Sequence, residues 1–189
     1  MGQTMGEQIQ IKGYHKSKLD RANRILSSRS FPISTGSNQW LGDGIYFWDN
    51  IDNALWWNMN DYRDGAILTA DLACDTDQFI DLDDPTQMCK IEEYADWIME
   101  QTKGTDTSIS FSDKIEARAF FCTLFKEAYS IQLMKHSFPK LEYNNAGFKT
   151  IHYRPQYCAT SMDIISNIQC EALTMWGSII GGEYANYYV

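Results

Sequence analysis

The spacing of apolar residues changes its period several times along the chain. Residues Gln8–Tyr14 alternate polar and apolar side chains, as a strand with one buried face does, and His15 stands at the end of this stretch. Across Lys18–Arg29 the apolar residues recur on one helical face, with Ser17 as the expected N-cap. The start of the chain therefore predicts a strand followed by a helix.

The rest of the chain repeats this mixture of periods. Helical spacing predicts three further helices, the first of them ended by Gly65: Ile51–Tyr62, Asp84–Lys103 and Lys114–Ile131. Short apolar runs between turn residues predict strands over Ala66–Asp71, Phe79–Leu82, Thr150–Tyr153 and Asn167–Met175. This order predicts an α+β fold in which helices interrupt a mostly antiparallel sheet. We expect one domain over residues 1–189, with residues 1–7 as a flexible start.

The stretch Trp40–Trp48, WLGDGIYFW, places a turn directly before a short aromatic strand. Successive side chains of a strand face opposite sides, so Ile45 and Phe47 are expected in the core and Tyr46 toward a pocket. The last tryptophan of the stretch shares the side of Tyr46. Asp43 lies between two glycines of the turn, where we expect it to shape the turn rather than to act on a substrate.

The net charge of −9 argues against generic electrostatic capture of nucleic acid, which relies on Lys and Arg neutralising phosphates. A local basic face is compatible with this sum, because the first thirty residues hold several cations: Lys12, Lys16, Lys18, Arg21, Arg24 and Arg29. The charge therefore leaves both a protein and a nucleic acid open as a partner.

The cysteine count is five, an odd number, and no two cysteines have CxxC spacing. The sequence shows no signal peptide and no apolar run long enough for a membrane helix. The histidines His15, His136 and His152 have no metal-like spacing. We therefore expect a reduced, cytoplasmic protein with free thiols, without a metal and without a membrane partner.

Three places combine residues that can do chemistry: Tyr14–Ser17, Gly44–Trp48 and Gln169–Glu171. Each also has an ordinary structural explanation, as a strand-end histidine, a hairpin strand or a solvated strand face. Together they suit the breaking of a glycosidic bond whose leaving group is a cationic heterocycle such as nicotinamide. A carboxylate stabilises charge on the ribose, an aromatic ring holds the heterocycle, and a histidine or hydroxyl binds another ribose hydroxyl. The residues that fit these roles are, in order, Glu171, Tyr46, and His15 with Ser17.

At these residues the chain resembles the ADP-ribosyltransferase superfamily. The resemblance lies in YHKS at Tyr14–Ser17, a helix ending in ILSSRSF, the WLGDGIYFW stretch and a following helix rich in Ala and Trp. It covers Tyr14 to about Trp57, and Ala66–Leu82 is similar to the strand that usually follows. The chain looks most like the branch with a histidine–tyrosine–acid triad, shared by poly(ADP-ribose) polymerases, diphtheria-type toxins and small bacterial or phage-defence toxins. This resemblance implies a split, twisted sheet with flanking helices and NAD in a central cleft.

The resemblance also implies roles for individual residues. His15 would hold a ribose hydroxyl of NAD, Tyr46 would stack on nicotinamide, and Glu171 would polarise the nicotinamide ribose. Gln169, on the same strand face, would either orient the acceptor or be the third member of the triad itself. The expected NAD-binding set is completed by Lys16, Ser17, Ser34 and Gly44. The family usually has glycine where this chain has Lys16, so a long cation at the lip changes access to the cleft.

Three functions follow as alternatives. The first is a mono-ADP-ribosyltransferase that moves ADP-ribose from NAD to a protein or a nucleic acid, as a toxin or phage-defence effector with an antitoxin or inhibitor protein. The second is an NAD glycohydrolase, in which water replaces the acceptor. The third is a catalytically silent module that binds a nucleotide or a protein, which the lysine after His15 favours. The acidic composition leans toward a protein acceptor.

Overall fold

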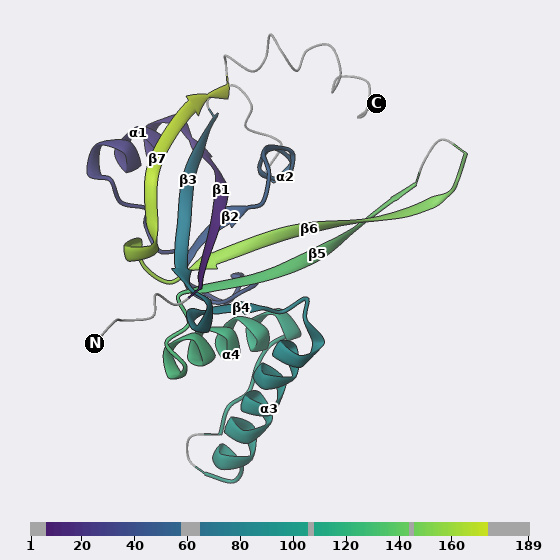
Figure 1. Ribbon diagram of the computed structural model, residues 1–189. Coiled ribbons are helices and arrows are strands. Elements are labelled where there is room, and N and C mark those ends of the chain that lie inside the picture. The colour runs from purple at the N-terminus through teal and green to yellow at the C-terminus, as the bar shows by residue number, and fades with distance from the viewer. Residues whose placement is uncertain (1–6, 58–64, 106–107, 144–145, 174–189) are drawn as a thin grey trace.

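The computed structural model describes residues 7–57, 65–105, 108–143 and 146–173, and its secondary structure is α+β, as the sequence predicts (Figure 1). The strands within these ranges are β1 Gln8–Lys18, β2 Ile45–Trp48, β3 Gly65–Asp75, β4 Phe79–Asp81, β5 Leu133–Tyr143, β6 Lys149–Ala159 and β7 Ile165–Ala172. In this described part of the chain they form one seven-stranded sheet, in the order β4-β5-β6-β2-β1-β3-β7. The pairing of β4 with β5 is parallel and the other pairings are antiparallel.

The sheet is nearly divided between β1 and β2. Strand β1 pairs with β3 along its whole length, whereas among the described residues it pairs with β2 only through Tyr14 and Trp48. Beyond this pair, β1 continues to Lys18 and β2 runs back to Ile45. Over these described residues the two strands do not pair with each other. One half of the sheet therefore holds β4, β5, β6 and β2, and the other half holds β1, β3 and β7.

Helices cover both faces of the sheet. Helix α1 (Leu19–Ser28) buries Ile25 on the face that carries Phe47. Helix α2 (Ile51–Trp56) packs on the opposite face, together with Trp48. Since neighbouring residues of β2 point to opposite faces, the two helices lie on opposite sides of the point where the sheet divides.

Helices α3 (Pro85–Thr102) and α4 (Lys114–Ala128) cover the β4–β5–β6 half, in a core that includes Met134 and Cys158. They lie together at the lower end of the molecule in Figure 1. Each begins at an aspartate whose side chain accepts backbone N–H bonds, Asp84 for α3 and Asp113 for α4, as expected for N-caps. Short 3₁₀ turns, η1 (Thr76–Gln78) and η2 (Met162–Ile164), lead into β4 and β7.

Three predictions near the first strand and helix are wrong. His15 does not end its strand, because β1 continues to Lys18 by pairing with β3. Ser17 is therefore a strand residue and not the N-cap of α1, and Lys18, which takes that position, makes no side-chain capping bond. Gly65 begins β3 instead of ending a helix. In each case sheet pairing with a distant strand decides a boundary that local sequence predicts differently.

The largest difference is the ribbon formed by β5 and β6. The sequence pattern predicts no strand over Leu133–Tyr143 and only Thr150–Tyr153 of β6, but the two strands pair along eleven residues each. Pro139 within β5 is compatible with a strand because β4 reaches only the first three residues of β5, so no neighbour needs the missing N–H. The outer part of this ribbon projects from the body of the molecule (Figure 1).

Other boundaries shift by a few residues. Helix α4 ends at Ala128 and not at Ile131, after which Ser130 adopts a left-handed conformation. Strand β7 begins two residues before the predicted Asn167. Helix α2 ends at Trp56 and strand β7 at Ala172, before the predicted ends at Tyr62 and Met175, which themselves lie outside the described residues.

Several predicted properties concern the whole chain. No helix within the described ranges is long and apolar enough to cross a membrane. All five cysteines fall in these ranges and are free thiols, as the sequence predicts. The His, Cys, Asp and Glu residues in the described part of the chain form no group of three or more that could hold a metal ion.

Candidate functional site

A pocket of about 500 Å³ lies where β1 and β2 separate. Its volume is in the range of small-molecule binding sites. Five of the predicted site residues line it: His15, Lys16, Ser17, Ser34 and Tyr46. The rest of its described lining comes from β1, α1, the loop before β2, and the starts or ends of neighbouring elements: Lys18, Asp20, Arg21, Arg24, Asn38, Gln39, Trp40, Trp48, Trp57, Gly65 and Gln156.

His15 joins the two halves of the sheet at the edge of this pocket. Its Nδ1 lies 2.8 Å from the carbonyl oxygen of Tyr46, and its ring packs edge-on against Phe31 and Phe47. A carbonyl only accepts, so Nδ1 carries the proton and Nε2 of the neutral ring is an acceptor. Burial, with a smaller effect of Arg21, lowers the pKa of His15 although the bond to Tyr46 opposes it. The neutral ring is therefore the stable form at physiological pH.

Tyr46 uses its hydroxyl to hold the loop before β2. The hydroxyl accepts a hydrogen bond from the Leu41 N–H at 2.9 Å and donates one to the Gly42 carbonyl at 2.5 Å. Burial, with the nearby Cys158 thiol, raises the pKa of Tyr46 far above its usual value. Since the hydroxyl is engaged and neutral, the ring is the part of Tyr46 that is suited to contact a ligand.

Side chains of helix α4 hydrogen-bond to the backbone of the same loop. Lys126, which is buried, donates hydrogen bonds to the carbonyls of Leu41 at 2.7 Å and Asp43 at 2.6 Å. The Asp43 N–H donates to the Thr123 hydroxyl at 2.8 Å, and the Asp43 carboxylate accepts from the Gly36 N–H at 3.1 Å. The carboxylate of Asp43 thus bonds within its own loop, as a turn-shaping residue does.

Gly44, a predicted NAD-binding residue, is outside the described lining of the pocket. A Cβ atom there would lie 2.3 Å from the sulfur of Cys158, so glycine lets β2 approach β6 closely. Its backbone exchanges two hydrogen bonds with Ser34, at 2.8 and 3.0 Å. Gly44 therefore fixes the position of Ser34 at the pocket. This close packing explains why a glycine stands at position 44 of the sequence.

Cations gather on one wall of the pocket. Lys16, Lys18, Arg21 and Arg24 all line it, and Asp20 is the one carboxylate in its described lining. The Lys16 ammonium group also donates to the Leu55 carbonyl at 3.4 Å, which directs it toward α2. The excess of positive charge favours an anionic ligand, and phosphate groups are the common biological case.

Indole rings also line the pocket. Trp40, Trp48 and Trp57 line the pocket, and Trp57 lies 5.6 Å from Trp40 and 5.7 Å from Trp48 between ring centroids. The ring of Trp57 is 42% exposed, so part of its surface is available to a ligand. Flat apolar surfaces of this kind hold aromatic heterocycles by stacking.

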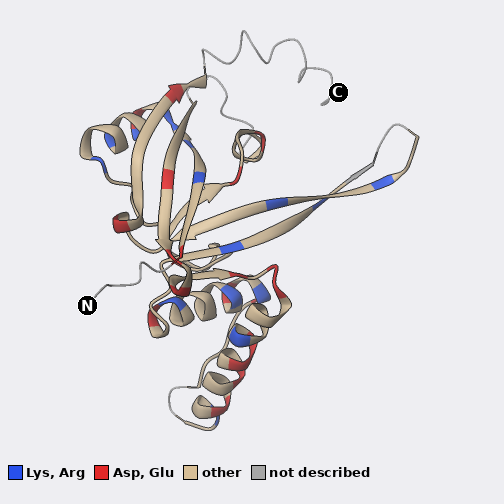
Figure 2. Ribbon diagram, viewed as in Figure 1, with Lys and Arg blue, Asp and Glu red and all other residues tan. Residues whose placement is uncertain are grey.

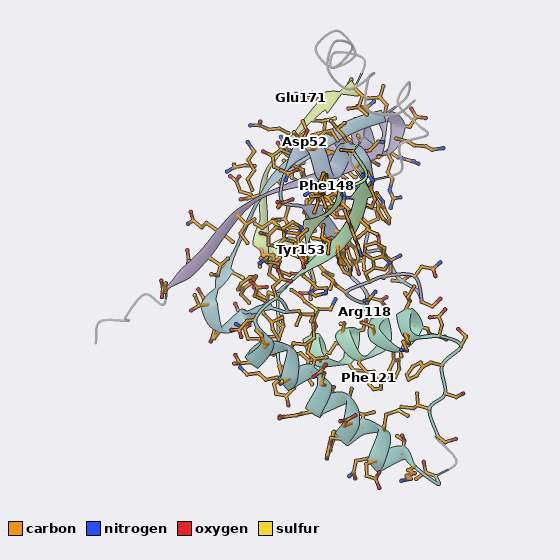
Figure 3. All side chains as sticks on the ribbon, turned by 90° about the vertical axis from the view of Figure 1, so that its right-hand side faces the viewer. Asp52, Arg118, Phe121, Phe148, Tyr153 and Glu171 are labelled. Carbon is orange, nitrogen blue, oxygen red and sulfur yellow. The ribbon has the colours of Figure 1, made fainter. Side chains whose placement is uncertain are left out.

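Glu171 and Gln169 are not brought to this pocket. Both are exposed on β7, which lies at the far edge of the β1–β3–β7 half. Glu171 pairs with Ile67, which pairs with Lys16, so Glu171 is two strands from the pocket, about 10 Å at the usual strand spacing. Figure 3 shows Glu171 near the upper end of β7. The structure therefore brings the predicted histidine and tyrosine to one pocket but leaves the predicted acid outside its described lining.

Gln156 is a buried polar residue of the pocket that the sequence pattern does not predict as a site residue. It is buried, lines the pocket and pairs across the sheet with Trp48 of β2. Its side chain shares the sheet face of Tyr46, since Cys158, two residues further along β6, pairs with Tyr46. The predicted strand stops at Tyr153, and a strand extended to Ala159 is the signal that would have found this residue.

Comparison with known proteins adds little about the chemistry. No family model matches the chain. The chain is similar to the uncharacterized protein MJ0359 of Methanocaldococcus jannaschii, with 32% identity over 81 residues. The alignment covers 39% of this chain and 38% of that protein, so the chain matches well under two thirds of the length of this relative.

Proposed function

We propose that the pocket binds NAD and that the protein transfers ADP-ribose from NAD to a macromolecule. The observation that carries this proposal is the convergence of His15, Lys16, Ser17, Ser34 and Tyr46, from three separate segments, on one pocket at the division of the sheet. Such a division between β1 and β2 is what an ADP-ribosyltransferase-like split sheet requires. The resemblance and the geometry thus support the same ligand from different directions.

Each part of NAD has a matching group in the pocket. The pyrophosphate matches the cations of β1 and α1, among them Arg21 and Arg24. A ribose hydroxyl can donate to Nε2 of His15, because the bond from Nδ1 to Tyr46 leaves Nε2 as an acceptor. Nicotinamide can stack on the ring of Tyr46, whose hydroxyl is held by the loop.

In the reaction, the bond between C1′ of the ribose and the nicotinamide nitrogen breaks, and its electron pair leaves with neutral nicotinamide. The acceptor supplies a lone pair for the new bond to C1′ and releases its proton to solvent. Positive charge develops on the ribose between these events, so the group that binds the ribose hydroxyls governs the rate. Gln156 is the polar residue of β6 in the pocket, and we assign it this position in place of Glu171.

A second function is favoured by one observation. Gln156 is neutral, and in the described lining Asp20 is the single carboxylate, on the exposed surface of α1. An amide dipole stabilises a developing cation less than a carboxylate does. A nucleotide-binding module without turnover is therefore the second candidate.

Calorimetry with NAD and assay of nicotinamide release test both functions together. We expect Tyr46→Ala to weaken NAD binding about threefold to tenfold through lost stacking, and Tyr46→Phe to retain most of the affinity.

We expect Gln156→Asn to lower the rate of nicotinamide release, while Glu171→Gln leaves this rate near that of the wild type. The opposite result for these two variants would return the role to Glu171. NAD binding without release would establish the silent module, and absence of NAD binding would end the proposal.

A further inference from the structure

A belt of aromatic and cationic side chains leads from the pocket onto the β5–β6 ribbon. Indole and phenyl rings form its continuous part, with centroid distances of 6.2 Å from Trp56 to Trp57, 5.6 Å from Trp57 to Trp40 and 4.3 Å from Trp40 to Phe138. Two cations lie over the ring of Trp56. The Arg154 guanidinium carbon is 4.2 Å and the Lys140 ammonium 5.7 Å from the centroid of Trp56. We call these six residues the aromatic–basic belt.

The register of the ribbon makes the belt continuous with the pocket. Phe138 pairs with Arg154 and Lys140 pairs with His152, so these four side chains share one face of the ribbon. Gln156, two residues beyond Arg154 on β6, has the same facing and lines the pocket. A chain laid along this face would therefore reach the pocket without leaving the ribbon.

Helix α2 carries Trp56 of the belt, and helix α4 lies beside the belt. The Arg118 guanidinium carbon is 5.4 Å from the centroid of Phe138, so α4 adds another cation beside the belt.

Charge is distributed unevenly over the molecule. The sequence of β5 and β6 holds four Lys and Arg residues and one Glu, and blue segments follow the ribbon in Figure 2. Helix α3, in contrast, holds four Asp and Glu residues and one Lys. The net charge of −9 therefore does not extend to the ribbon, in which the four cations exceed the one Glu.

We propose that the aromatic–basic belt binds a single-stranded nucleic acid and presents it to the pocket. Flat rings accept any unpaired base by stacking, and the Lys and Arg beside them match the phosphates between bases. A folded protein partner needs neither the repeated rings nor the cations beside them. The role of this strand as the acceptor of ADP-ribose rests on the proposed function, with a nucleobase nitrogen or oxygen supplying the lone pair and losing a proton.

Fluorescence anisotropy tests the belt directly. The full chain is titrated into fluorescein-labelled oligothymidylate or oligouridylate of about 20 nucleotides, without NAD, at several salt concentrations from about 50 mM upward. We expect saturable binding that weakens with salt, quenching of tryptophan fluorescence, and much weaker binding of a duplex, whose bases are already stacked. Lys140→Gln is expected to weaken binding about threefold or more and to reduce the salt slope by about 0.7.

Lys103→Gln is the matched control. Lys103 lies at the end of α3 with 75% of its side chain exposed, and its substitution removes the same charge far from the belt. Equal effects of the two substitutions, equal affinity for the duplex, or no saturable binding of either oligonucleotide would overturn the proposal. Transfer of label from NAD to a product that protease removes and nuclease does not would assign a protein acceptor instead. Since the titration contains no NAD, it is independent of the calorimetric test of NAD binding.

Discussion

At the scale of single residues, His15 shows how the fold fixes a protonation state. The Tyr46 carbonyl accepts a hydrogen bond from Nδ1–H, and the rings of Phe31 and Phe47 pack edge-on against the imidazole. A second proton would place a positive charge in this buried environment, near the positive charge of Arg21. The acceptor at Nε2, on which the proposed ribose contact depends, therefore exists only while the ring is neutral.

This arrangement predicts a loss of stability in mild acid. The pKa of His15 is lowered in the folded state, so below its usual value of 6.5 the unfolded chain binds a proton that the folded protein does not. The free energy of unfolding should therefore fall as pH decreases through about 6.5. Denaturant titrations across this range measure the effect. His15→Asn should reduce this fall in the free energy of unfolding. A contribution from His136 should remain, because burial lowers the pKa of that residue as well. A pH-independent wild-type protein would contradict this account.

Lys126 is a second residue whose contacts decide local structure. Its substitution by Met leaves the carbonyls of Leu41 and Asp43 without their donor. Each unsatisfied buried carbonyl costs about 1–3 kcal/mol, so Lys126→Met should lower the free energy of unfolding by about 2 kcal/mol or more. Chemical denaturation measures this difference. Lys114→Met, on the exposed first turn of the same helix, should change it by less than about 0.5 kcal/mol.

At the scale of elements, α4 begins at a cap that combines two reciprocal contacts. The Asp113 carboxylate accepts from the N–H groups of Ile115 and Glu116 at 2.8 and 2.9 Å. The Glu116 carboxylate in turn accepts from the hydroxyl and the N–H of Ser112, both at 2.6 Å, and these bonds lower its pKa. This cap sets the start of the helix that carries Lys126.

Removal of the cap should be visible in stability but small in function. Asp113→Ala should lower the free energy of unfolding by about 1 kcal/mol, and Asp113→Asn by less, because asparagine also caps well. Thermal unfolding followed by circular dichroism compares the two variants. An equal loss for alanine and asparagine would show that the aspartate acts through its charge and not as a cap.

At the scale of the whole molecule, the division of the sheet is the main architectural feature. The two halves share the Tyr14–Trp48 pair and, through His15, a side-chain bond to the Tyr46 carbonyl. A ligand between β1 and β2 contacts both halves, so it should restrain their relative motion. The pocket and the division are thus aspects of one arrangement.

Hydrogen exchange tests this coupling. With saturating NAD, amide exchange should slow in Lys16–Lys18 of β1 and in Ile45–Trp48 of β2, because ligand binding stabilises both segments together. Exchange in the outer part of the β5–β6 ribbon should be unchanged by NAD alone. Protection confined to one half of the sheet would contradict a ligand held between them.

The sequence by itself determined those features that depend on neighbours along the chain. Alternation identified β1, and the helical period located α3 and α4 closely. The aromatic stretch at Tyr46 was correctly assigned to a strand with Ile45 and Phe47 in the core. These features follow from local geometry, because a side chain's facing depends on its own strand or helix.

Only the tertiary structure decided which segments meet. The ribbon, the length of β1 and the start of β3 depend on pairing with strands far away in sequence, and local pattern does not specify that pairing. For the same reason Gln156 lies in the pocket while Glu171, the more obvious chemical choice, lies two strands away. Strand order places side chains together, and strand order is a property of the whole sheet.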